Sequence, residues 1–184
     1  MFDFTLGGRI KLIDKSFIKA LESLRQRLDG LGVKWVVAGD FAEALQVVQV
    51  DPDCVEILTD ATDAQKVWSS VKDLDPTPTA CIEQSVARNA LSEGREYPIT
   101  VRSLYFEFAL DGIKVKVYGD KQFRIDSWDW GDTLEFEPKY VNVVGQRIAV
   151  IPLSIQRELY ERLGWMDRVE KINRATSFLK HGPR

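Results

Sequence analysis

The sequence has 184 residues, of which 45% are hydrophobic and 29% are charged, and its formal net charge is −3. This composition is that of an ordinary globular protein with one substantial core, so we expect a single domain over residues 1–184. The slightly acidic balance gives no overall attraction to phosphate backbones, and no basic patch predicts a nucleic-acid surface.

The sequence carries no signal for a membrane. Its apolar stretches are far shorter than the roughly 20 residues that cross a bilayer. The N-terminal segment MFDFTLGGRIK lacks the apolar core of a signal peptide. We therefore expect a cytoplasmic protein without membrane contacts.

The first third of the chain alternates helical and strand patterns. Apolar residues at steps of three and four predict an amphipathic helix over about 15–30. The segment 33–39 (VKWVVAG) is short, β-branched and bounded by glycine, which is typical of a buried strand. Helical spacing resumes over 40–50, and 54–58 (CVEIL) predicts a second buried strand.

A third helix is expected after that strand, where Thr62 and Gln65 have the spacing of a capping box. The following segment, 73–98, contains three prolines and few clear signals. Only CIEQSVARNAL (81–91) suggests a short helix. We expect 73–98 to be an excursion on the surface.

Strand patterns dominate from residue 99 onward. The segments LYFEFAL and IKVKVYG flank Asp111-Gly112, which is a strong hairpin signal because glycine accepts positive φ. Further strands are expected in parts of 122–126, 133–137 and 140–151. A C-terminal helical segment, 152–180, then begins at Pro152, whose missing N–H is not needed in a first turn. We expect a break in it near Gly164.

This order of helix, strand, glycine turn, helix, strand and antiparallel hairpin resembles the nucleotidyltransferase superfamily related to DNA polymerase beta. The resemblance spans about residues 16–175. In that family one strand ends in Gly-Gly or Gly-Ser, the next carries Asp-x-Asp, and a later strand carries a third carboxylate. Here VVAGD, CVEILTD and GIKVKVYG stand for the three. The resemblance implies an α/β (α+β) fold, with a mixed, partly antiparallel central sheet flanked by helices.

The chemistry of the family explains the residues of its motifs. Nucleotidyl transfer uses two divalent metal ions about 3.5 to 4 Å apart, which align the attacking and leaving oxygens. Mg²⁺ prefers oxygen ligands, so three carboxylates form the cage. The small residues after the first strand let backbone N–H groups approach the triphosphate. The resemblance therefore assigns Gly39 and Asp40 to nucleotide binding.

The three catalytic positions implied by the resemblance are Cys54, Glu56 and Lys116. Only Glu56 is a carboxylate, a thiol is a poor ligand for Mg²⁺, and Lys116 brings a positive charge to the third position. One carboxylate cannot build a two-metal site, so we expect no metal cofactor. If the protein is an active enzyme, Glu56 would bind Mg²⁺ or Mn²⁺ with help from Asp53 or Asp60. Alternation along a strand would point Asp53 away from Glu56.

Two of these residues also have ordinary structural explanations. Asp40 lies three residues before Glu43, so we expect it to cap the helix over 40–50, where its charge would repel a triphosphate. Counting outward from the turn places Glu107 opposite Lys116, which predicts a cross-strand ion pair. We further expect Lys116 to lie near Glu56 and to neutralise it in place of metal.

Aromatic and basic residues outside these motifs leave alternatives open. Trp128 and Trp130 could stack on a base, although tryptophans are more often packing residues. Arginines of the excursion and the strand after it could bind phosphate, although scattered arginines are usually solvated; these are Arg88, Arg95 and Arg102.

The sequence thus predicts a nucleotidyltransferase-fold protein with a degenerate active site. We expect a non-catalytic or strongly diverged module that binds an NTP, or a protein partner through the C-terminal helices. The alternative is an active metal-dependent enzyme that moves a nucleotide from an NTP to a hydroxyl of a protein, RNA or small molecule.

Overall fold

The computed structural model describes residues 13–133 and 136–181. Its α-helices are α1 (Lys15–Leu28), α2 (Gly39–Leu45), α3 (Ala61–Ser70), α4 (Leu153–Arg162) and α5 (Met166–His181), with one 3₁₀ turn at Lys72–Leu74. Its strands are β1 (Val36–Ala38), β2 (Val55–Thr59), β3 (Ala80–Ser85), β4 (Ala90–Ser92), β5 (Arg95–Tyr97), β6 (Ile99–Leu110), β7 (Ile113–Ile125), β8 (Lys139–Val143) and β9 (Gln146–Val150).

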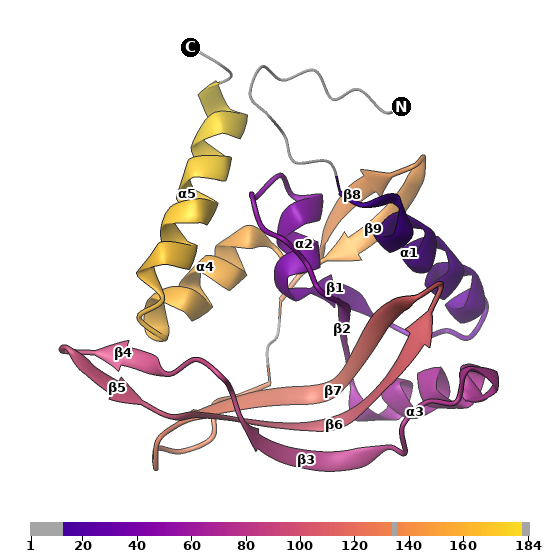
Figure 1. The fold of residues 1–184 in the computed structure, drawn as a ribbon, viewed down its shortest axis with the longest axis horizontal. Helices are drawn as coiled ribbons and strands as arrows, with labels where there is room; N and C mark the ends of the chain where they lie inside the picture. Colours follow the sequence, from indigo (N-terminus) through magenta and orange to yellow (C-terminus); the bar gives the residue numbers. More distant parts are fainter. Residues whose placement is uncertain (1–12, 134–135, 182–184) are drawn as a thin grey trace.

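Seven strands form one mixed sheet in the order β3-β6-β7-β2-β1-β9-β8. The pairs β2–β7 and β1–β9 are parallel, and the other pairs are antiparallel. Strands β4 and β5 form a separate hairpin, which extends beneath the turn between α4 and α5 (Figure 1). The predicted fold class, a partly antiparallel sheet flanked by helices, is confirmed.

The two faces of the sheet have different roles. Helices α1 and α3 cover one face, where their apolar side chains pack against Val55, Ile57, Val115 and Val117. All four of these valine and isoleucine residues are fully buried. The residues between them, at alternate positions, point to the opposite face. That second face carries the candidate site.

Short local signals account for the best-predicted elements. Asp14 caps α1 by accepting a hydrogen bond from the Ser16 backbone N–H. Asp111 and Gly112, with φ of 52° and 80°, make the tight turn between β6 and β7. The helical tail is broken between α4 and α5, where Gly164 has a φ of 68°. Pro152 directly precedes the first residue of α4.

The prediction for residues 81–91 is wrong. Instead of a helix, this stretch contributes β3, an edge strand paired with β6, and the start of the β4–β5 hairpin. Pairing with the long strand β6 satisfies the backbone there, which local helical spacing could not indicate.

Two smaller expectations also need correction. Helix α3 is capped by Asp60 and not by Thr62. The expectation of strands in parts of 140–151 is confirmed by β8 and β9, which are joined by a turn at Val144-Gly145. Within the expected strand 133–137, residues 134 and 135 lie outside the described residues, and the other three have no regular structure. Among the residues that the structure describes, no helix combines the length and apolarity needed to cross a membrane.

Candidate functional site

The site is built on a row of residues that crosses three neighbouring strands. Ala38 at the end of β1 pairs with Glu56 on β2, and Glu56 pairs with Lys116 on β7. Paired residues of adjacent strands point to the same face, so Glu56 and Lys116 project side by side. The predicted proximity of these two residues therefore follows from the register of the sheet.

A β-bulge on β7 adds Lys121 to this row. Between the pairs Leu104–Gly119 and Arg102–Gln122 the strand β7 contains one residue more than β6. The irregularity is at Asp120, which has a φ of 51°. Because an extra residue reverses the alternation of side chains, Lys121 turns to the side that Lys116 faces.

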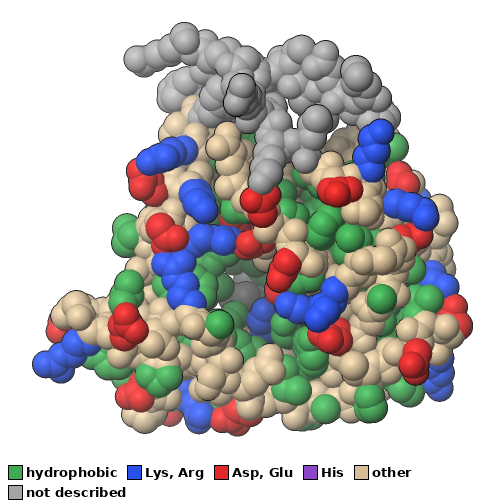
Figure 2. Space-filling model, in the orientation of Figure 1, with side chains coloured by type: hydrophobic (Ala, Val, Ile, Leu, Met, Phe, Trp, Pro, Cys, Tyr) green, Lys and Arg blue, Asp and Glu red, His purple; other side chains and the backbone are tan. Residues whose placement is uncertain are grey.

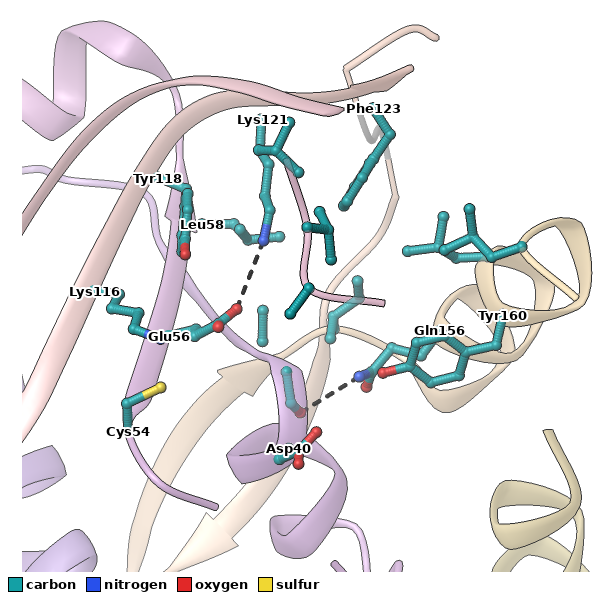
Figure 3. Close-up of a pocket in the computed structure, with 18 of the residues that line it drawn as sticks. Asp40, Cys54, Glu56, Leu58, Lys116, Tyr118, Lys121, Phe123, Gln156 and Tyr160 are labelled. Atoms are coloured by element: carbon teal, nitrogen blue, oxygen red, sulfur yellow. Dashed lines mark hydrogen bonds and ion pairs between the residues drawn. The ribbon is translucent and has the colours of Figure 1, made fainter. Parts of the chain in front are cut away.

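These residues line a cavity of about 450 Å³, a size within the range of about 300 to 1,000 Å³ typical of small-molecule sites. Figure 2 shows a hollow on this face with acidic and basic side chains around it. In Figure 3, Glu56, Lys116 and Lys121 form one wall, and Gln156 and Tyr160 of α4 form the opposite one. Asp40, Cys54 and Asp53 also line the cavity, as do these apolar side chains: Val101, Phe123, Ile151, Leu159 and Leu163.

Glu56 is held between the glycine turn and Lys121. The Nζ of Lys121 lies 3.6 Å from a carboxylate oxygen of Glu56 (Figure 3). A Cβ at Gly39 would lie 3.1 Å from the same oxygen, and Gly39 has a φ of 64°. Glycine at this position therefore leaves room for the Glu56 carboxylate as well as permitting the turn.

Cys54, at one end of the cavity, carries a neutral thiol. Burial, with added effects of Asp53 and Glu56, raises the pKa of Cys54 to about 12. A thiol in this state is a weak nucleophile and a weak metal ligand near neutral pH. Asp53 precedes β2, so strand alternation does not apply to it, and its carboxylate, hydrogen-bonded to Cys54, lines the same cavity.

Lys116 stays charged in this environment. Burial alone would lower its pKa, but Cys54 and Glu56 outweigh that effect, and the pKa of Lys116 is raised. Lys116 is opposite Glu107 in the sheet, as counting from the turn predicts. The ion pair of Glu107, however, is with Lys114 at 3.5 Å, because Lys116 is directed toward Cys54.

The residues of this site do not fit a two-metal centre. Asp60 caps α3, where its carboxylate accepts a hydrogen bond of 2.7 Å from the Asp63 backbone, and it does not line the cavity. Within residues 13–133 and 136–181, no three His, Cys, Asp or Glu side chains are grouped so that they could hold a metal ion. The neighbours of Glu56 in the cavity include two lysines: Lys121, 3.6 Å from its carboxylate, and Lys116, its partner in the sheet.

The expected cap of α2 by Asp40 is wrong. The helix begins at Gly39, its N-cap is Ala38, and Asp40 makes no capping bond but pairs with Arg168 of α5. Glu43 is fully buried and accepts hydrogen bonds from Tyr160 (2.7 Å) and Arg168 (2.9 Å) instead of reaching back to the helix start. The charge of Asp40 is thus shared with a guanidinium group.

The segment before β4 and the turn after α4 close another side of the cavity. The Leu91 backbone donates to the Leu163 carbonyl (2.9 Å), and the Trp165 indole donates to the Asn89 carbonyl (2.7 Å). Arg88 pairs with Asp167 and lies over the Trp165 ring. Residues 84–87, at the end of β3 and after it, line the cavity together with Leu163 and Trp165. We call residues 84–98, which include the β4–β5 hairpin, the arm.

The other aromatic and basic candidates lie outside the cavity lining. Trp130 is sandwiched between the guanidinium groups of Arg102 and Arg124, each 4.5 Å from its ring. Trp128 is 56% exposed and lies near Tyr97. Arg95 is an exposed residue of β5. The structure therefore brings none of these groups to the Glu56 site.

Sequence reasoning missed two important residues, Lys121 and Arg168. The bulge that turns Lys121 inward has no clear sequence signal beyond an aspartate at Asp120, a residue type that tolerates positive φ. Arg168 lies 128 positions from Asp40, so its pairing could not be inferred from local spacing.

The whole fold is similar to nucleotidyltransferases of known structure. TM1012 from Thermotoga maritima, a candidate nucleotidyltransferase, matches with a TM-score of 0.64 and 23% sequence identity, over 90% of this chain and 96% of that chain. ANT(2″)-Ia in complex with adenylyl-2″-tobramycin matches with a TM-score of 0.52 and 8% identity, over 89% and 90%. A solution structure of ANT(2″)-Ia gives 0.51 and 7%, over 91% and 86%.

Neither a model of a protein family nor a curated protein matches the sequence. The structural similarity, at these identities, concerns the fold. The chain has a nucleotidyltransferase fold.

Proposed function

We propose that this nucleotidyltransferase fold serves as a nucleotide-binding module that does not transfer the nucleotide. Its cleft would hold an NTP without divalent metal. The fold supports the first part, because ANT(2″)-Ia, which shares it, was solved with an adenylylated compound. The residues of this chain support the second part.

One observation carries the proposal: Lys116 stands beside Glu56 in the sheet, where the resemblance would place a third metal-binding carboxylate. A two-metal site needs several oxygen ligands to offset the charge of its ions. Here an ammonium group and a neutral thiol replace two of them, and Lys121 lies 3.6 Å from the third. A divalent cation would be repelled, whereas a phosphate group would be attracted.

The test is to titrate the protein with ATP by calorimetry, once in EDTA and once with Mg²⁺ or Mn²⁺. We expect binding in EDTA that added metal does not strengthen, and a rise in melting temperature with ATP concentration. Incubation with radiolabelled ATP and metal should yield no nucleotidylated product.

Two results would contradict the proposal. Binding only with metal, together with release of pyrophosphate, would identify an active enzyme that moves a nucleotide to a hydroxyl of a protein, RNA or small molecule. No binding under any condition would leave a protein-interaction role, in which the C-terminal helices contact a partner.

A further inference from the structure

The side chain of Lys121 is placed in the cleft by a local distortion of β7. Regular alternation after Lys116 and Tyr118 would direct Asp120 and Gln122 into the cavity. The extra residue at the bulge exchanges the two sets, so that Lys121 and Phe123 line the cavity instead. An aspartate is thereby removed from the cleft and a lysine is added.

The contacts of the Lys121 ammonium group are weak. It lies 3.9 Å from the centre of the Tyr118 ring and 5.5 Å from that of Phe123. Its ion pair with Glu56, at 3.6 Å, is longer than a hydrogen bond of about 2.7 to 3.2 Å. A lysine has three donors, so this group retains capacity for acceptors of a ligand.

The two lysines next to Glu56 provide positive charge for an anionic group. Five charged residues line the cavity: Asp40, Asp53, Glu56, Lys116 and Lys121. Asp40 is paired with Arg168, and Asp53 is hydrogen-bonded to Cys54. Lys121 pairs with Glu56 at 3.6 Å, while Lys116, the neighbour of Glu56 in the sheet, is directed toward Cys54. Phe123, next to the Lys121 ammonium group, belongs to an apolar cluster with Leu159 and Leu163, and all three line the cavity. The cavity thus offers a cationic end for phosphate and an apolar end for a planar ring.

We propose that Lys121 binds the phosphate of a nucleotide directly, without metal, and that Glu56 is the carboxylate it exchanges for that phosphate. This inference rests on the function proposed above. It adds the residue that binds the phosphate, and it states that Glu56 weakens nucleotide binding. In a metal-dependent site Glu56 would be required for binding. Here its negative charge opposes the phosphate.

The experiment measures ATP and adenosine binding by calorimetry in EDTA for four variants. Lys121→Gln should weaken ATP binding about tenfold or more, as expected for loss of a charged hydrogen bond, and leave adenosine binding unchanged. Lys121→Arg should keep most of the affinity. Glu56→Gln should tighten ATP binding by about fivefold, since a like charge near 4 Å is removed.

Lys114→Gln is the matched control, because Lys114 is on the same strand, is exposed and does not line the cavity. It should bind ATP like the unmodified protein. Melting temperatures without ligand establish that each variant is folded.

The two proposals fail in different ways. If the unmodified protein binds ATP in EDTA but Lys121→Gln binds equally well, or Glu56→Gln binds more weakly, the role of Lys121 and Glu56 is wrong and the metal-free module stands. If the unmodified protein binds ATP only with metal, or not at all, both proposals are overturned.

Discussion

At the scale of single residues, the most consequential contact is the pairing of Glu43 and Arg168. Glu43 is fully buried beneath the C-terminal helices. Burial raises its pKa, and the Tyr160 hydroxyl and Arg168 oppose this rise. Because its pKa is higher in the folded than in the unfolded chain, protonation of Glu43 favours folding. Its contribution to stability therefore falls as the pH rises through the folded pKa.

Removing Arg168 should reveal the free-energy cost of burying the Glu43 carboxylate. We expect Arg168→Met to lower the free energy of unfolding by about 3 kcal/mol near pH 7, since a buried carboxylate loses its counter-charge. The pKa of Glu43 then rises further, so the loss should be largest above that pKa and should shrink as the pH falls to 5. Urea denaturation at both values measures the difference.

Arg157→Met provides the comparison, because Arg157 pairs with Glu161 on the exposed face of α4. This substitution should lower the free energy of unfolding by no more than about 0.5 kcal/mol at either pH. An equal loss for Arg168→Met at pH 5 and pH 7 would mean that Glu43 is not the group left uncompensated.

At the scale of elements, the bulge of β7 depends on close packing against α3. A Cβ at Gly119 would lie 2.9 Å from the Ala61 Cα and 3.0 Å from the Ala64 Cβ. The nearest of these atoms belongs to the helix backbone, which cannot move aside as a flexible side chain could. Glycine at the start of the bulge therefore allows β7 to approach the first turn of α3.

We expect Gly119→Ala to cost about 2 kcal/mol of stability through overpacking. Gly131→Ala is a suitable control, since its added Cβ would meet only the Phe123 carbonyl at an ordinary 3.4 Å. That change should stay within about 0.5 kcal/mol. Thermal or urea unfolding of the two variants gives the comparison, and equal stabilities would show that α3 adjusts without strain.

The elements also show where sequence reasoning succeeds. The Asp111-Gly112 turn and the regular part of β7 were predictable, because turn chemistry and side-chain alternation are local. The family resemblance indicated that the strands carrying Glu56 and Lys116 are neighbours. Asp40 was misassigned because its local spacing fits a capping box, whereas its partner Arg168 comes from the far end of the chain.

At the scale of the whole molecule, the cleft lies between two parts of the fold that are in contact at several places. One part is the sheet, and the other is the pair α4 and α5, which follows β9 directly in the chain. Besides the contacts of Glu43 with Tyr160 and Arg168, the two parts are connected by the arm with β4 and β5, which meets the α4–α5 turn (Figure 1). Residues 84–87 of the arm line the cavity, so we expect this contact to determine how closely they approach the C-terminal helices.

A substitution at Gly164 tests the contact between the arm and the α4–α5 turn. An added Cβ would lie 2.0 Å from the Leu91 carbonyl oxygen. We expect Gly164→Ala to lower stability by about 3 kcal/mol and to speed hydrogen exchange of the Leu91 amide, because the arm must move off the turn. Under the proposed function, it should also weaken ATP binding. Gly94→Ala, with a similar φ of 73° but no atom within 4 Å, isolates the backbone cost of about 1 kcal/mol. If the two variants exchange at Leu91 equally fast and bind ATP equally well, the arm does not shape the cleft.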